Sequence, residues 1–258
     1  MSTAATVVRP GFQWHTRGSW SAREDRRPSL VWLGLIWIGM IAGFGLDGDR
    51  FRHEVPAPGT LIYVHAAVFT VWLLILTAQV LLVVSDRVAI HRKLGWFAAA
   101  WACVMLVLGP WAAMVAKGPL PSGPGSPQFL SVQFGDISAF AVLLLWGITL
   151  RKNPAAHKRV MILATVAIVD PGYARLANHF IAEPHSTVMW FVSMFYGNVM
   201  VIALMAAWDA WRGRLMKQFA VGAVGLLSVE CLQAFLYHWG PWRSFTIELL
   251  AAWGRHFG

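Results

Sequence analysis

Seven separate runs of apolar residues occur along the chain, and each is close to the length that a helix needs to cross a bilayer. A helix of about 20 residues spans the hydrocarbon. The composition agrees, because 57% of the residues are hydrophobic and only 13% are charged, which excludes an ordinary soluble domain. We therefore predict an all-α protein, a bundle of about seven transmembrane helices. The runs cover residues 29–46, 60–84, 94–116, 129–150, 159–180, 186–208 and 218–238.

Lys and Arg residues are unevenly distributed over the segments that join these runs. The N-terminal segment and every second loop hold 15 of them, whereas the other loops and the C-terminal segment hold five. Because such residues are enriched in cytoplasmic loops, we predict that the N-terminus is inside and the C-terminus outside. The same bias accounts for the net charge of +9, so the expected partner is the lipid bilayer and not a nucleic acid.

Three parts of the chain follow from this topology. Residues 1–28 are predicted to form a basic cytoplasmic tail, and residues 29–238 the seven-helix transmembrane domain. Residues 239–258 are too few to span the membrane, and their apolar and polar residues alternate at roughly helical spacing. We expect this last segment to lie on the outer surface as an interfacial helix.

Ionisable side chains lie inside the apolar runs, where such groups are expensive unless they are paired or functional, and five of them are candidates for one polar site. In the predicted topology four of them fall in one slab in the outer half of the membrane, on the order of 10 Å thick. The fifth, His179, lies just above the slab. We predict that the five line a polar pocket: His65, Asp136, Arg175, His179 and Glu230.

Asp136 and Arg175 have opposite charges at matched depth on consecutive helices, so we expect an ion pair between them. The pair either fixes the packing of the helices or anchors a polar ligand, with His65, His179 or Glu230 able to exchange protons. Arg175 is also close enough to the surface for its side chain to extend to the headgroups.

The sequence Asp170-Pro171-Gly172 interrupts the fifth apolar run. Proline removes a backbone donor and glycine weakens the helix further, so a kink is predicted at these residues. Asp170 is expected to accept hydrogen bonds at the break, or to carry a proton if it is buried and neutral.

Two of the cytoplasmic loops resemble each other. Residues 86–94 and 152–160 each place a histidine before two cationic residues and an aliphatic residue, at the point where a helix leaves the inner interface. These histidines, His91 and His157, either meet headgroup phosphates or face each other as axial ligands of a haem iron.

The loop motifs carry a family resemblance. HRKLGW at 91–96 and HKRVMILAT at 157–165 resemble the loop signatures of an uncharacterised group of bacterial polytopic membrane proteins, in which the preceding helix is matched by His65, Trp72 and Gln79. The resemblance covers about residues 60–180, which we take as the functional core. It implies a multi-pass protein of the bacterial inner membrane.

A more distant similarity connects this core with the ascorbate-dependent two-haem transmembrane cytochromes b, which transfer electrons across membranes. In that family histidines on alternate helices hold each haem, and His91 and His157 match the inner pair. The similarity implies haem b as the cofactor. The outer pair is incomplete, because the helix that should complement His65 offers Asp136 and no histidine.

These observations favour a haem-binding or quinone-linked electron-transfer protein, with no catalytic residue assigned. One alternative is a non-catalytic subunit that packs against partner proteins or pigments. Another is an outer-face metallohydrolase with zinc ligands drawn from His65, His179, His238 and Asp136. The chain lacks the paired-histidine spacing of such sites, so no metal ligand is predicted.

Overall fold

The computed structural model describes residues 26–53, 58–118, 120, 122–180, 186–213 and 215–257, and this part of the chain is helical without any strand. The all-α prediction is confirmed for these residues. Two short 3₁₀ turns, η1 (Pro127–Phe129) and η2 (Leu150–Lys152), flank α4. The helices are α1 (Arg26–His53), α2 (Thr60–Val84), α3 (Val88–Val115), α4 (Leu130–Thr149), α5 (Pro154–Val166), α6 (Asp170–Phe180), α7 (Thr187–Trp211), α8 (Lys217–His238) and α9 (Gly240–Phe257).

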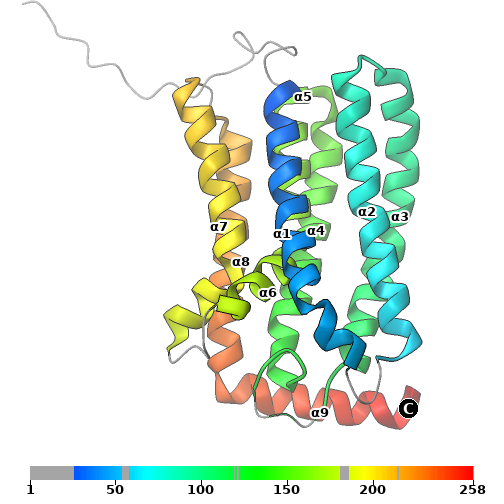
Figure 1. Ribbon diagram of the computed structural model, residues 1–258, viewed down its shortest axis with the longest axis vertical. Helices are drawn as coiled ribbons and strands as arrows, with labels where there is room; N and C mark the ends of the chain where they lie inside the picture. Colours follow the sequence, from blue (N-terminus) through cyan, green and yellow to red (C-terminus); the bar gives the residue numbers. More distant parts are fainter. Residues whose placement is uncertain are drawn as a thin grey trace, which may run out of the picture.

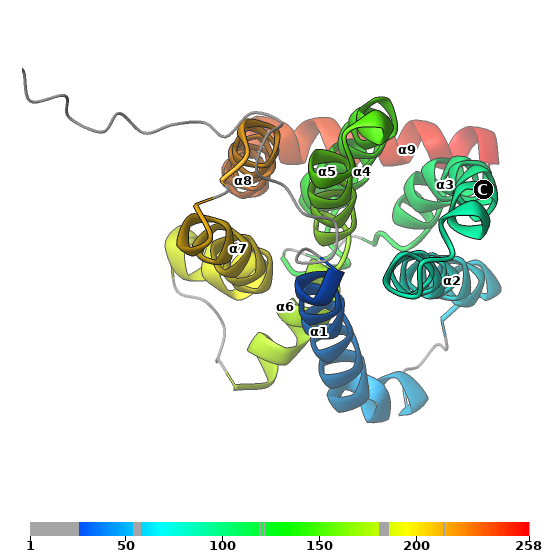
Figure 2. The same ribbon diagram turned by 90° about the horizontal axis from the view of Figure 1, so that it is seen from above.

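Six of these helices are long and apolar enough to cross a membrane, and the bent pair α5 and α6 supplies a seventh span if the two count as one. The chain is therefore a multi-pass membrane protein by length and composition. The helices α2 and α3 form a pair on one side of the bundle, α7 and α8 form a pair on the other, and α1, α4, α5 and α6 lie between them (Figures 1 and 2).

The two ends of the bundle differ in the elements that they carry. The basic end carries the start of α1 and the α2–α3, α4–α5 and α7–α8 connections. The α9 end carries α9, which lies across the bundle (Figure 1). Trp242 anchors α9 by donating from its indole nitrogen to the carbonyl of Gln128 at 3.0 Å, and Trp253 packs in the same apolar cluster as Leu130. The predicted interfacial segment 239–258 corresponds to this helix.

Both helices that carry the loop histidines begin earlier than predicted. At the start of α5, the side chain of Asn153 accepts a hydrogen bond from the Ala156 amide at 3.4 Å, and Pro154 occupies the first helical position. α3 begins at Val88, two residues after the left-handed residue Asp86, whose φ is 60°. As a result His91 and His157 lie in the first turns of helices, not in loops.

The fifth apolar run is broken into α5 and α6, whose axes meet at 49°. The turn between them has three hydrogen bonds of i to i−3 type, from Ile168 to Thr165, from Val169 to Val166 and from Gly172 to Val169. Pro171 is the second residue of α6, where a helix needs no backbone donor. The break lies at residues 167–169, so that Pro171 falls in the first turn of α6, because proline can start a helix but cannot continue one.

α1 and α6 cross at close range through glycines. Gly39 and Gly43 lie one turn apart on α1, and a Cβ on Gly43 would overlap the carbonyl oxygen of Gly172 on α6. A Cβ on Gly172 would in turn lie 2.8 Å from the carbonyl oxygen of Gly39. Small residues at this spacing let two membrane helices approach closely. The crossing is reinforced by Tyr173, whose hydroxyl donates to the carbonyl of Leu35 at 2.7 Å.

The loop that follows α3 contains a half-buried lysine, Lys117, whose pKa is lowered. The ammonium group of Lys117 donates to the carbonyl of Pro124 at 2.5 Å and lies 5.1 Å from the centroid of the Phe129 ring. Burial lowers the pKa of Lys117 to about 7.

This pKa predicts a pH-dependent stability. An unfolded lysine has a pKa of about 10.4, so between about pH 7 and about pH 10 the unfolded chain binds more protons and the folded state gains stability as the pH rises. In detergent, the midpoint of thermal unfolding should therefore rise more with pH for the wild type than for Lys117→Met. Equal slopes for the two proteins would contradict the prediction.

Candidate functional site

Three carboxyl groups from three helices meet in the half of the bundle nearer the α9 end. Asp136 lies about two turns after the start of α4, Asp170 opens α6 at the break, and Glu230 lies about two turns before the end of α8. The carboxyl groups of Asp136 and Asp170 lie close enough to interact electrostatically with each other and with Glu230. Asp170 and Glu230 are each only 1% exposed. We call Asp136, Asp170 and Glu230 the carboxyl cluster.

Two buried amide side chains complete this cluster. Gln233, one turn after Glu230, donates from its nitrogen to Asp136 at 2.9 Å, and Asn198 on α7 donates to Glu230 at 2.9 Å. Gly135 provides the space for Gln233, because a Cβ on this glycine would overlap the amide. The cluster thus connects α4, α6, α7 and α8 at one depth. Sequence reasoning did not select either amide, although Gln233 lies within the depth of the predicted slab.

The predicted ion pair between Asp136 and Arg175 is wrong. Arg175 extends from α6 toward α1, where its guanidinium donates to Asp47 at 3.0 Å and lies 4.3 Å from the centroid of the Phe44 ring. It also donates to the carbonyl of Pro171 at 2.9 Å. The physical reason is helix rotation: matched depth places two residues in one slab but does not decide which neighbouring helix each side chain faces.

The two histidines of the predicted pocket do not join the carboxyl cluster. The His65 ring on α2 lies 4.2 Å from the ring of Phe69 on the same helix, and its buried Nδ1 has no hydrogen-bond partner among the described residues. His179 is exposed near the end of α6 and contacts the neighbouring ring of Phe180. Of the five predicted pocket residues, Asp136 and Glu230 meet, and Asp170, predicted as part of the kink, is their third partner.

A pair of histidines forms a second candidate site, at the basic end. The ring centroids of His91 on α3 and His157 on α5 are 6.4 Å apart, and the ring planes are nearly perpendicular, at 84°. Both side chains are half-buried. His157 Nδ1 lies 2.7 Å from the carbonyl oxygen of Gly147. Because a carbonyl oxygen only accepts, Nδ1 carries the proton, and the lone pair of the neutral ring is on Nε2.

The side-chain amide of Gln79 on α2 sets the state of the other ring. Its nitrogen lies 2.5 Å from His91 Nδ1 in the amide orientation in which its oxygen also accepts from the Gly95 amide at 3.0 Å. In this orientation Nδ1 accepts, so a neutral His91 carries its proton on Nε2. Turning the amide over presents its oxygen to Nδ1, which then donates and leaves the lone pair on Nε2.

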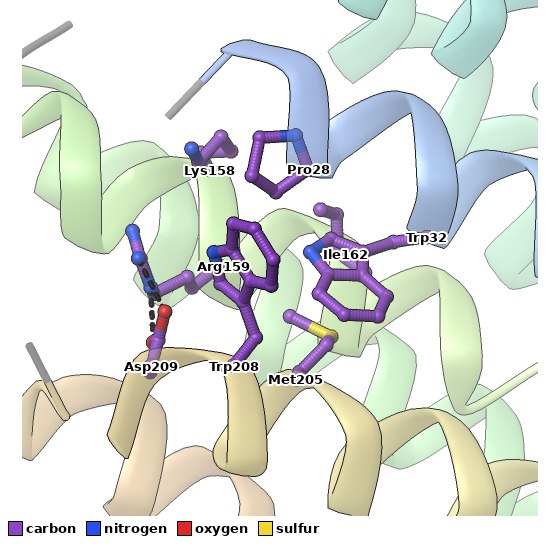
Figure 3. Close-up of a pocket in the computed structure, with 8 residues that line it drawn as sticks. All are labelled: Pro28, Trp32, Lys158, Arg159, Ile162, Met205, Trp208 and Asp209. Atoms are coloured by element: carbon purple, nitrogen blue, oxygen red, sulfur yellow. Dashed lines mark hydrogen bonds and ion pairs between the residues drawn. The ribbon is translucent and has the colours of Figure 1, made fainter. Parts of the chain in front are cut away.

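A buried ion pair joins α5 and α7 at the same end of the bundle (Figure 3). Arg159 and Asp209 form two parallel hydrogen bonds of 2.5 Å and 2.6 Å, and both side chains are 5% exposed. Arg159 also donates to the carbonyl of Ala155 at 3.1 Å. The pair lines a small pocket beside Trp32, Met205 and other side chains. In the sequence Arg159 was one of many cations near the cytoplasmic interface, and nothing indicated a buried partner.

The described residues contain no group of three or more His, Cys, Asp or Glu side chains arranged to hold a metal ion. The ligands considered for an outer-face metallohydrolase are thus not gathered in this part of the chain. No family model, curated protein or solved structure matches the chain. The geometry of the two sites is therefore the basis for inferring a function.

Proposed function

We propose that the protein is a multi-pass protein of the bacterial inner membrane that holds a haem b between His91 and His157 and transfers electrons, with a membrane quinone as redox partner. In this proposal the basic end faces the cytoplasm, as the distribution of Lys and Arg predicts. Haem held by two imidazoles supplies one-electron chemistry, and its potential depends on the ligands and their hydrogen bonds.

The observation that carries the proposal is the separation of the two rings. Two metal–nitrogen bonds of about 2 Å each, with about 1 Å from each nitrogen to its ring centroid, make about 6 Å between centroids of opposed ligands. The separation of His91 and His157 is 6.4 Å. The two residues also come from different helices, α3 and α5, so that they approach each other from two sides.

The hydrogen bond of the His157 ring supports the same assignment. A metal-bound histidine usually donates its other ring N–H to a carbonyl or carboxylate, which orients the ring. The contact of His157 Nδ1 with Gly147 is of this kind and leaves Nε2 available. At His91 the same arrangement requires the Gln79 oxygen to face Nδ1, so haem binding and the orientation of this amide are linked.

The decisive experiment is an absorption spectrum of the gently solubilised protein with a pyridine haemochrome assay. We expect a Soret band, its loss in His91→Ala and in His157→Ala, and its retention in the control His179→Ala, which changes an exposed histidine at the opposite end. The proposal would be overturned if wild-type protein, purified from cells supplied with haem precursor, contained no haem and could not take up added haemin.

Two substitutions at Gln79 refine this test. Gln79→Leu removes the oxygen that orients His91 and is expected to weaken haem affinity by about 10-fold or more. Gln79→Glu offers only acceptor oxygens to Nδ1 when it is ionised, so affinity should be retained or increased. Equal affinities for the leucine and glutamate variants would contradict the proposed role of Gln79.

A further inference from the structure

The carboxyl cluster contains more hydrogen-bond acceptors than donors. An ionised carboxylate has acceptor sites only, about four per group. Among the described residues, Glu230 Oε2 has no hydrogen-bond partner. The same is true of both carboxylate oxygens of Asp170. The carboxyl of Asp136 is close enough to Asp170 to interact with it electrostatically. Neighbouring carboxyl groups can satisfy each other by a hydrogen bond only if one of them carries a proton.

The two amides add to this surplus. Asn198 Oδ1 and Gln233 Oε1 have no hydrogen-bond partner within the described part of the chain, and the two side chains are 1% and 2% exposed. The nitrogen of each amide already donates to Glu230 or Asp136. Since oxygen and nitrogen share one carbon, each unpaired oxygen lies beside the carboxyl that its nitrogen contacts. The surroundings of the cluster therefore need a donor, and a protonated carboxyl is a donor.

One cation interacts with the cluster and is also paired outside it. Arg175 interacts electrostatically with Asp170, but its guanidinium is held by Asp47 on α1 and by the carbonyl of Pro171. The elements that pack around the cluster contribute uncharged groups at this point, Asn198 from α7 and Gln233 from α8. Three ionised carboxylates would leave an excess of negative charge at membrane depth, which is expensive.

Further unpaired polar atoms lead from the cluster toward the α9 end. Ser131 Oγ and Gln133 Oε1 are buried without a hydrogen-bond partner among the described residues. Both lie on α4 between its start and Asp136, and at 1.5 Å per residue Ser131 is about 7 Å along the helix axis from Asp136. Buried polar atoms therefore occur on α4 at depths between the cluster and the aqueous phase at that end.

We propose that Asp136, Asp170 and Glu230 form a buried proton-binding site that exchanges protons with the aqueous phase at the α9 end, past Ser131. The proton bound by one carboxyl is donated to a neighbouring carboxylate or to an amide oxygen. Release returns the proton to water and leaves a carboxylate. This site goes beyond the proposed electron transfer and requires no haem, so it can be tested on protein without cofactor.

Infrared spectroscopy of the full chain in lipid tests the proposal, because a protonated carboxyl has a C=O band distinct from that of a carboxylate. At neutral pH we expect such a band, its shift in D₂O as the proton exchanges, and its disappearance at alkaline pH. The variants Asp170→Asn and Glu230→Gln are near-isosteric and should remove or diminish it. Glu248→Gln, an exposed glutamate on α9, is the matched control and should leave the band unchanged.

Each remaining outcome is decisive. Absence of the band in the wild type, or no shift in D₂O over hours, would overturn the proposal without reference to any variant. Loss of the band on adding Na⁺ at constant pH would overturn it in favour of a cation site. For the route, Ser131→Val should slow deuterium exchange at least several-fold, whereas Ser228→Val on the exposed side of α8 should not; equal rates would overturn the route.

Discussion

Replacing Asp209 by Ala is expected to lower the free energy of unfolding by about 3–5 kcal/mol, because it leaves the charge of Arg159 in a buried place without its carboxylate. Both partners are 5% exposed, and the two short hydrogen bonds between them cross from α5 to α7. Denaturant titration in a mild detergent, followed by near-ultraviolet circular dichroism, measures the change.

The double variant Arg159→Met with Asp209→Leu tests the physical reason. Apolar residues of similar volume can replace a buried ion pair with little loss of stability, so the double variant should be more stable than Asp209→Ala alone. Lys152→Met, which removes an exposed cation at the same end of the bundle, is the control and should change stability by less than about 0.5 kcal/mol. A double variant no more stable than the single one would contradict this account.

The length of an apolar run predicted the position of a helix well where charged or turn-forming residues flank the run. The runs 60–84 and 218–238 correspond to α2 (Thr60–Val84) and α8 (Lys217–His238). Depth within the membrane was also informative, since Asp136 and Glu230 were placed in one slab and do belong to one cluster. Both results follow from the fixed rise per residue of a helix, which ties position in sequence to depth.

Rotation and pairing could not be predicted in the same way. Arg175 faces Asp47 because α6 packs on α1, and sequence order alone favoured the next helix along the chain. Asp170 looked like part of a kink, yet the break that Pro171 imposes is what brings its carboxyl to Asp136. The sequence did contain one indication of the packing of α1 against another helix, because Gly39 and Gly43 have the small-residue spacing of a close helix crossing.

That crossing gives the second large prediction. Gly43→Ala adds one methyl group where a Cβ would overlap the carbonyl oxygen of Gly172, a backbone atom that cannot rotate away. The two helices must separate or tilt, and overpacking of this kind typically costs about 1–3 kcal/mol and occasionally more. Gly45→Ala is a matched control two residues further along α1, because a Cβ there has nothing within 4 Å.

The control should change stability in the opposite direction, since alanine in place of an exposed helical glycine stabilises a helix by about 0.5–1 kcal/mol. Denaturant titration of both variants in the same detergent measures the difference. The crossing also positions Asp170, two residues before Gly172, so Gly43→Ala should weaken the infrared band of the carboxyl cluster as α6 moves away from α4. Two glycine variants of equal stability would mean that α1 does not hold α6 in place, and the position of Asp170 would then depend on the packing of α6 against α7.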